Sequence, residues 1–240
     1  MATLNLFSIT NKYSGFQFET TDTVILIDIY RATSTIVTAF GNGVKEIIPC
    51  VEIEQVSKIK NKNNEILGAC ERNGKKIDGM DFDNSPVSFN NANIADKIIA
   101  ISTTNCTKAI EIAKNTKEII FASFLNLDAV CNYITDNVES IERCVILCAG
   151  NKKKESEEDN LFASELIFTL NKGIDLIMDE RSFQLFSERE EIPFALEKLI
   201  NSTHAKRLIS LEKRKDIDFS LIFNKFDCVP IYANHSIKKK

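Results

Sequence analysis

The feature that most constrains the fold is an order that occurs twice: an apolar strand, a turn rich in hydroxyl groups, and a helix. TVILIDI, at residues 23–29, is almost entirely apolar, which is typical of a strand buried on both faces, and YRATST follows it directly. KIIAIS, at 97–102, is followed by TTNCT. Buried strands that alternate with helices predict an α/β protein of three layers, α/β/α, around a mostly parallel sheet, with some antiparallel pairing left open.

The same patterns predict the remaining elements. Further strands are expected at 45–51, 65–69, 117–123 and 143–149 and near 228–232, and helices at 34–43, 53–62, 107–115, 126–137 and 160–170. After residue 170 the chain is expected to be mostly helical up to 216–223, and the tail IKKK is expected to be a solvated end. Residues 70–91 have no clear period and therefore predict a long loop, which in a compact domain is usually functional or disordered.

The two strand–turn–helix segments align with each other without a gap. A shift of 72 positions places Thr35 on Thr107, and KEII at 45–48 on KEII at 117–120. This likeness predicts two similar βαβ units, around 23–51 and 97–123, within a single domain that covers residues 1–240.

We define the first turn as residues 27–35 and the second turn as residues 100–107. At a helix N-terminus, free N–H groups and the positive end of the helix dipole can bind an anion, although helix capping alone would also explain polar side chains there. The candidate substrate ligands are Thr33, Ser34 and Thr35 in the first turn and Thr103, Thr104, Asn105 and Thr107 in the second. Arg31 offers a fork that matches phosphate or sulfonate oxygens, and we expect Arg31 and Asn105 to face one cleft.

Asp28 stands at the end of the first buried strand and should be ionised at neutral pH. Its negative charge opposes the binding of an anion unless another group offsets it. A divalent cation that bridges Asp28 to a phosphate would do so, and an ion pair with Arg31 is the alternative.

Composition excludes several classes of function. The net charge of −4 gives no basic surface for nucleic acid, and no apolar run reaches the roughly 20 residues that span a membrane. The N-terminus lacks the pattern of a signal peptide, and the seven scattered cysteines suit reduced thiols in the cytoplasm. His204 and His235 lie outside any cluster, so a zinc site or a nucleophile activated by histidine is not expected. A metal would need oxygen ligands, which favours Mg²⁺ or Mn²⁺.

Two further segments are rich in acidic residues. The loop after residue 69 contains Glu71, Arg72, Asp78, Asp81, Asp83, Asn84 and Ser85, although surface loops are polar by default. Before the helix expected at 160–170, Ser156 precedes Asp159 by three residues, the spacing of a capping box, so capping would explain both. Glu158 has no such local reason.

Taken in order, these segments resemble the 2-phosphosulfolactate phosphatase (ComB) family over nearly the whole chain. The resemblance rests on DIYRATST, ERNG followed by GMDFDNSP, STTNCT, LCAG followed by SEEDNLFA, and DIDF followed by VP. It implies a magnesium-dependent phosphatase that converts 2-phosphosulfolactate to sulfolactate and phosphate, a step toward coenzyme M. A homodimer, the number of metal ions and the substrate in the cell are left open.

The resemblance also implies candidate roles for the residues at the motif positions. The candidate catalytic residues are Asp28, Arg31, Glu71 and Arg72, and Arg31, Arg72, Asn84 and Ser85 join the polar residues of the two turns as candidate substrate ligands. Some of Asp28, Glu71, Asp81, Glu158 and Asp159 would hold the metal ion. We favour direct attack on the phosphate by a water that the metal activates, with a covalent aspartyl or seryl phosphate as the alternative.

The chain departs from the family pattern at two places. Cys106 stands where the family usually has glycine, which would cost energy if that position needs a positive φ or a close approach to an anion. Lys152, Lys153 and Lys154 stand where the family tends to have glycine. These departures are the only support for one rival interpretation, a non-catalytic anion-binding homologue. The other alternative, a phosphatase for a different phosphorylated hydroxy acid, stays open because the family that the chain resembles also occurs in organisms that do not make coenzyme M.

Overall fold

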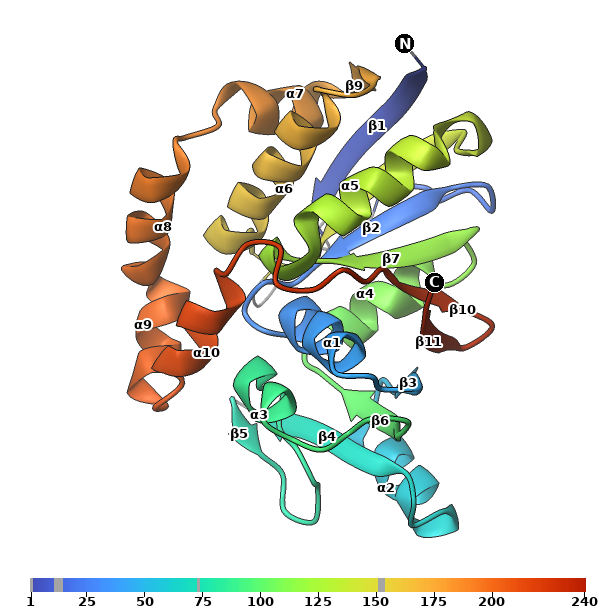
Figure 1. The fold of residues 1–240 in the computed structure, drawn as a ribbon, viewed down its shortest axis with the longest axis vertical. Helices are drawn as coiled ribbons and strands as arrows, with labels where there is room; N and C mark the ends of the chain where they lie inside the picture. Colours follow the sequence, from blue (N-terminus) through green and yellow to red (C-terminus); the bar gives the residue numbers. More distant parts are fainter. Residues whose placement is uncertain (1, 11–14, 73, 151–153) are drawn as a thin grey trace.

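The structure, a computed structural model, describes residues 2–10, 15–72, 74–150 and 154–240. In these ranges eleven strands form one sheet in the order β5-β4-β6-β3-β11-β10-β7-β2-β8-β1-β9 (Figure 1). The strands are β1 (Thr3–Thr10), β2 (Thr23–Ile27), β3 (Glu46–Pro49), β4 (Leu67–Arg72), β5 (Lys75–Lys76), β6 (Ile98–Ser102), β7 (Glu118–Ala122), β8 (Arg143–Cys148), β9 (Asp175–Met178), β10 (Pro230–Ala233) and β11 (Ser236–Lys239). The predicted α/β class with a mostly parallel, mixed sheet is confirmed.

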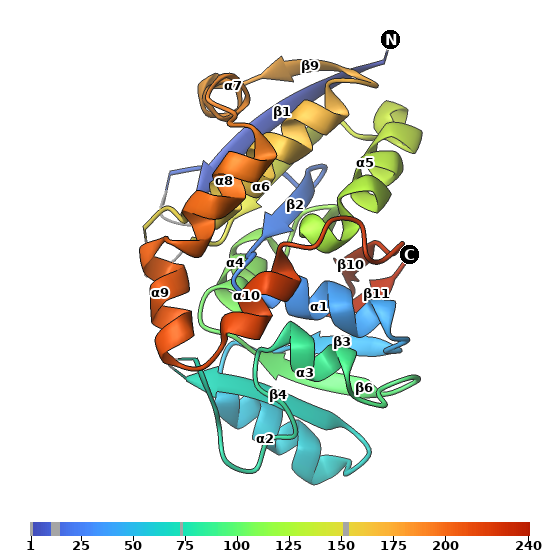
Figure 2. The same ribbon diagram turned by 60° about the vertical axis from the view of Figure 1, so that its left-hand side comes forward.

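Helices and short 3₁₀ turns connect the strands. The α-helices are α1 (Ala32–Gly41), α2 (Ile53–Lys62), α3 (Pro86–Asn90), α4 (Cys106–Ala113), α5 (Leu127–Asp136), α6 (Glu157–Leu170), α7 (Glu180–Ser187), α8 (Ile192–Ile200), α9 (Thr203–Ser210) and α10 (Arg214–Ser220). The 3₁₀ helices are η1 (Phe124–Asn126) and η2 (Val138–Ser140). As Figures 1 and 2 show, α8, α9 and α10 form a column along one side of the molecule, where α9 and α10 lie beside the strand ends. No helix in the described ranges is long and apolar enough to cross a membrane.

The sheet consists of two parallel groups that a hairpin separates. Strands β4, β6 and β3 are parallel to one another, as are β7, β2, β8, β1 and β9. The β10–β11 hairpin pairs antiparallel with β7 on one side and with β3 on the other. The backbone of the tail is therefore part of the sheet, because fully buried Ile237 pairs with Ile47, whereas Lys238, Lys239 and Lys240 are exposed as expected.

This topology does not show the two predicted βαβ units. The expected order of elements is present, as β2-α1-β3 and β6-α4-β7, but the strands of each pair are not neighbours in the sheet. Three successive antiparallel pairings also separate β2 from β3, so these two strands are not parallel partners. Sequence likeness between the segments therefore reflects similar local structure without showing a repeated unit.

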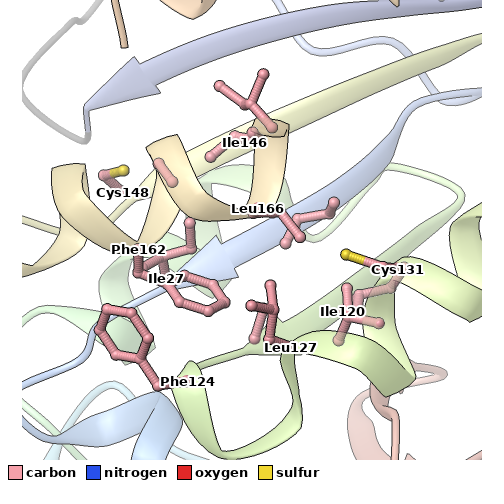
Figure 3. Packing of buried hydrophobic residues seen from close by; sticks show 14 of the residues in the cluster. Ile27, Ile120, Phe124, Leu127, Cys131, Ile146, Cys148, Phe162 and Leu166 are labelled. Atoms are coloured by element: carbon pink, nitrogen blue, oxygen red, sulfur yellow. The ribbon is translucent and has the colours of Figure 1, made fainter. Parts of the chain in front are cut away.

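Side chains alternate between the two faces of the central strands and so contribute to two hydrophobic clusters, one on each face. Ile25 and Ile27 of β2 point into one hydrophobic cluster, and Val24 and Leu26 point into the other, as the two-residue period of a strand requires. The first cluster packs α5 and α6 on the sheet, and Figure 3 shows Ile27, Phe124 and Phe162 interlocked there with Leu127 and Leu166. Helix α1 is buried at every position from Ala32 to Phe40, which explains why its sequence has no charged residue.

Two regions differ from the sequence prediction. Strand β1 was not predicted, although its burial alternates and it pairs with β8 inside the sheet. The expected loop at 70–91 contains the end of β4, all of β5 and α3. It is held to the sheet through Asp81 and Phe82, whose backbone N–H groups donate to the carbonyl oxygen of Gly68.

Candidate active site

A small pocket lies where β2, β4 and β6 end, beside α9. Its volume is about 90 Å³, and it is lined by Asp28, Tyr30, Arg31, Glu71, Gly74, Asn84, Thr103, Thr104, Asn105, His204, Arg207 and Leu208. Arg31 and Asn105 thus face one cavity, as predicted from the two turns. The ends of β2, β4 and β6 meet at this pocket although β2 belongs to one parallel group of strands and β4 and β6 belong to the other. Because twist accumulates from strand to strand, the two ends of a wide sheet are rotated relative to each other.

The hydroxyl groups of Thr33 and Ser34 stabilise the first turn itself. Thr33 Oγ1 lies 2.9 Å from the carbonyl oxygen of Asp28 and 3.1 Å from its N–H, and Ser34 Oγ donates to the carbonyl oxygen of Ile29 at 2.9 Å. Thr33, Ser34 and Thr35 are fully buried and do not line the pocket. These bonds close the connection from β2 to α1, so the structure does not bring these three candidate ligands to the cavity.

Arg31 lines the pocket but is already paired with acidic groups. Its Nη1 lies 2.7 Å from Asp216 Oδ2 and 3.6 Å from Asp83 Oδ2, and all three side chains are buried. Ser85 Oγ also donates to Asp216 at 2.6 Å, and Lys213 Nζ donates to Asp83 at 2.7 Å. The resulting buried network of two cations and two carboxylates joins the first turn to the loop before α3 and to α10. Asp28 is not part of it, so the predicted ion pair between Asp28 and Arg31 is not observed.

Asp28 and Glu71 are both buried carboxylates of this pocket, and the pKa of Asp28 is raised. Burial raises the pKa of Asp28 to about 6, and the charges of Glu158 and Glu71 add to this increase. The Ala32 N–H, a long donor at 3.4 Å, and His204 act in the opposite direction. A carboxylate in this environment gains from a cation more than an exposed one does.

The second turn faces the pocket and is tied to β4. Thr104 Oγ1 donates to Glu71 Oε1 at 2.6 Å, and the Gly74 N–H donates to Glu71 Oε2 at 2.7 Å. Thr103 Oγ1 accepts from the N–H of Thr107, whose own hydroxyl donates to the carbonyl oxygen of Thr103 at 2.7 Å. Thr103, Thr104 and Asn105 are therefore held at the N-terminus of α4 with their positions in the cavity defined, whereas Thr107 serves the turn.

The carboxylates of the SEEDN segment act in ways that differ from the prediction. Ser156 is the N-cap of α6, but its hydroxyl makes no capping bond and has no hydrogen-bond partner among the described residues, so the predicted capping box is wrong. Asp159 instead accepts from the N–H groups of Ile29 at 2.9 Å and Gly150 at 3.1 Å, which joins the ends of β2 and β8. Glu158 Oε1 lies 2.6 Å from His204 Nδ1, which supplies the reason that the local sequence did not give.

Of three other predicted site residues, Arg72, Asp81 and Asn84, only Asn84 lines the pocket. Arg72 is largely exposed, lies 3.9 Å from Glu52 and does not line the cavity. Asp81 binds Lys60 at 2.5 Å and the N–H of Gly68 at 2.7 Å, also away from the cavity. Asn84 does line the cavity. The structure thus brings one of these three to the pocket, and Ser85 stays in the buried network of Arg31.

Sequence reasoning missed two residues of α9. His204 and Arg207 are one helical turn apart and line the same pocket, and the His204 ring also packs edge to face on Tyr30. No carboxylate or cysteine lies close to either in sequence, so spacing gave no signal. The helix is fixed by buried Ala205 and Leu208 and by its N-cap Ser202, which accepts from the Ala205 N–H.

Cys106 does not occupy a position that requires glycine. It is the first residue of α4, is fully buried, and is not among the described residues with positive φ. A positive φ, one of the two conditions under which a side chain would cost energy at this position, is therefore not met. Lys152 and Lys153 lie outside the described residues, and Lys154 borders a neighbouring cavity.

Cys106→Gly should therefore destabilise the protein, by about 1–2 kcal/mol, because it removes a buried side chain and adds a flexible residue to a helix. Urea unfolding of both proteins under reducing conditions measures the difference. A gain in stability would show that the backbone at residue 106 is strained after all.

The donor groups of the pocket suit a hard cation. Asp28 and Glu71 line it with oxygen atoms, and the charge of Glu158 acts on Asp28 from the side of α6. Among the residues that the structure describes, no three His, Cys, Asp or Glu side chains are arranged to hold a metal ion. The chemistry therefore fits Mg²⁺ around Asp28, whereas a complete set of protein ligands is not preformed.

A small cavity at strand ends, with acidic side chains and a helix N-terminus around it, places the molecule among the α/β proteins that bind small anionic ligands at this edge of the sheet. Comparison with known proteins makes this class more specific. Residues 10–235 match the model of the 2-phosphosulpholactate phosphatase family. The chain belongs to this family, which is one of phosphoric monoester hydrolases.

Individual relatives match over nearly their whole length. The chain is 39% identical over 217 residues to a probable 2-phosphosulfolactate phosphatase of Thermotoga petrophila, covering 88% of this chain and 89% of the relative. It is 36% identical to a protein of the same description from Caldanaerobacter subterraneus subsp. tengcongensis, with 90% and 89% covered. A third relative, from Clostridium novyi, is 33% identical, with 90% and 92% covered. The family expected from the sequence motifs is thus confirmed.

Proposed function

We propose that the chain is a Mg²⁺-dependent phosphatase that removes phosphate from a small acidic metabolite, with 2-phosphosulfolactate as the preferred substrate and sulfolactate as the product. The observation that carries this proposal is the meeting of Asp28 with the second turn in one pocket of a chain that belongs to this family. Its place in coenzyme M biosynthesis, a cytoplasmic location and a homodimer stay predictions from the sequence.

The residues of the pocket suggest a division of roles. Thr103, Thr104 and Asn105 bring the N-terminus of α4 to the cavity and can orient phosphate oxygens. Asp28, together with Glu71 or Glu158, would hold the metal ion, which when bound supplies positive charge against the phosphate and favours the ionised form of water. His204, with Nδ1 engaged by Glu158, is left with Nε2 as the ring nitrogen available to a ligand.

The choice of nucleophile is narrower than the sequence suggested. The hydroxyl of Ser34 is fully buried and bonded to the carbonyl oxygen of Ile29, and that of Ser85 is buried and bonded to Asp216. A seryl phosphate at either residue would need these bonds to break, so we favour attack by water, with an aspartyl phosphate on Asp28 as the alternative. Mass spectrometry of protein quenched in acid during turnover separates them, because only the covalent route adds a phosphoryl group to Asp28.

Removal of divalent cations should abolish phosphate release, and Mg²⁺ or Mn²⁺ should restore it. The reason is that Asp28, Glu71 and Glu158 place negative charge where the substrate phosphate must bind. Phosphate release from 2-phosphosulfolactate, measured with EDTA and then with each cation added back, tests this expectation. Mg²⁺ should also raise the melting temperature of the wild-type protein, and activity that persists in EDTA would contradict the proposal.

The second candidate, an anion-binding homologue without turnover, loses support from the structure. It rested on Cys106 and on the lysine run, and Cys106 lies in ordinary helical backbone. Binding of 2-phosphosulfolactate without release of phosphate under any of the metal conditions above would establish this alternative.

A further inference from the structure

The cations near the pocket differ in whether acidic groups already neutralise them. Arg31 is buried against Asp216 and Asp83, and Lys213 shares Asp83, so that network carries no excess positive charge. Arg72 does not reach the cavity. The two arginines that sequence analysis assigned to substrate anions are therefore engaged or absent from the pocket.

Arg207 also lines the pocket, but unlike Arg31 it is not paired with a described acidic side chain. Its side chain is half-buried and lines the cavity, and no described carboxylate forms a salt bridge with it. Its backbone is held by α9, whose Ala205 and Leu208 are buried in the core on either side of it. A guanidinium that extends from an anchored helix to a cavity, with donors that no described acid occupies, is a specific ligand for an oxyanion.

The position of Arg207 also gives room for a larger substrate. Arg207 and His204 border both the first pocket and a neighbouring cavity of about 380 Å³. The carboxylates Asp28 and Glu71 line the first pocket but not the second, whose lining includes Lys154, Glu155, Glu157 and Glu158. An acidic group that extends from the phosphate as far as Arg207 therefore moves away from Asp28 and Glu71, and it needs the guanidinium there because glutamates border the second cavity.

We propose that Arg207 binds the second acidic group of the substrate, a sulfonate or a carboxylate, and so selects phosphate esters that carry such a group over neutral ones. This assignment rests on the proposed phosphatase function. The phosphate lies between Asp28 and the N-terminus of α4, and the sulfonate or carboxylate end lies against the guanidinium of Arg207. The arginine is a specificity-determining residue that touches substrate without taking part in the bond that breaks.

Arg207→Gln tests the assignment against two substrates. The KM for 2-phosphosulfolactate should rise about tenfold to a hundredfold, the scale of a lost charged hydrogen bond, with kcat nearly unchanged. The kcat/KM for propan-2-yl phosphate, which has no second acid, should stay within about threefold of wild type. Lys206→Gln is the matched control, because it removes the same charge from the adjacent, exposed position that lines neither cavity. Arg207→Lys keeps the charge and should recover part of the loss.

Binding of sulfolactate, measured by calorimetry, provides a readout that needs no turnover. Wild type should bind sulfolactate, and Arg207→Gln should weaken this binding about tenfold or more, the scale of a lost charged hydrogen bond. Lactate identifies the group that Arg207 contacts, because its binding should fall equally if that group is the carboxylate and stay unchanged if it is the sulfonate. An equal loss of activity on both substrates, or unchanged KM and unchanged sulfolactate binding, would overturn the assignment. If wild type releases phosphate from neither ester, the proposed function fails, and calorimetry alone then tests Arg207. The assignment is overturned if wild type does not bind sulfolactate, or if Arg207→Gln binds it as tightly as wild type.

Discussion

Asp28→Asn should reduce phosphate release by about a thousandfold or more, because it removes the charge at the centre of the acidic pocket while keeping the shape of the side chain. The amide oxygen can still accept from the N–H of Ala32, so the turn should keep its structure. Steady-state release of phosphate at saturating Mg²⁺ measures the loss. Activity within tenfold of wild type would remove Asp28 from the proposed roles.

The same substitution should stabilise the protein when no metal is bound. Burial raises the pKa of Asp28 from 3.8 to about 6, so between these pH values Asp28 is mostly protonated in the folded state and mostly ionised in the unfolded state. Wild type therefore loses stability as the pH rises from about 4 to above 6, and asparagine avoids a cost that reaches about 3 kcal/mol. Urea unfolding in EDTA should show the gain at pH 8 and none at pH 4; an equal gain at both values would contradict the titration argument.

Asp81→Asn is a matched control with the opposite sign. Partial burial alone would raise the pKa of Asp81, but the hydrogen bonds from Lys60 and the Gly68 N–H outweigh it and lower this pKa below its usual range. The ionised form then contributes stability above the unfolded pKa, and this contribution disappears as the pH falls through the folded pKa. Asp81→Asn should therefore destabilise the protein at pH 8, with a smaller effect at low pH, and leave the Mg²⁺ requirement unchanged.

Arg31→Met should cost about 3–5 kcal/mol of stability, because it leaves Asp216 and Asp83 buried with less compensating charge. For a chain of this size the melting temperature should fall by about 10 °C or more. This expectation gives Arg31 a structural role in addition to the role that the sequence suggests, in which it binds the substrate. Thermal unfolding without ligand measures the change.

Arg214→Met is the control for Arg31, since Arg214 pairs with Asp218 on the surface of α10 with both side chains about half exposed. Its loss should change stability by no more than about 0.5 kcal/mol. The double variant Arg31→Met with Asp216→Asn should recover part of the loss, because the buried uncompensated charge is gone. Equal effects of Arg31→Met and Arg214→Met would show that the buried network contributes little.

Local pattern predicted much of the architecture. The apolar runs at 23–29 and 143–149 became β2 and β8, and the periodic segments at 53–62 and 126–137 became α2 and α5. Strand β1 was missed because the apolar residues of TLNLFSIT do not keep to one face: buried Leu4 and Leu6 are followed on the same face by polar Ser8 and Thr10, which are also buried. The tail was missed because its lysines suggest solvent, whereas backbone pairing through Ile237 places it inside the sheet.

Among the polar residues, too, local pattern placed some correctly in the pocket and misplaced others. The sequence identified the second turn and Asp28 as neighbours of one cavity, because strand ends and helix N-termini meet at such edges. It assigned the buried hydroxyls of the first turn to ligands, although their bonds are local and close the turn. A hydroxyl that binds the backbone and one that faces a ligand have the same pattern in sequence, and only burial separates them.

By itself the sequence determined the α/β class, the family and the pocket's acidic and helix-terminal groups, because these depend on residues within a few positions of one another. Only the tertiary structure decided which charges are free. Arg31 meets Asp216 across 185 positions, and Glu158 meets His204 across 46. Electrostatic compensation depends on distances in space that local spacing does not encode, so the neutralised Arg31 and the available Arg207 could be told apart only in the folded molecule.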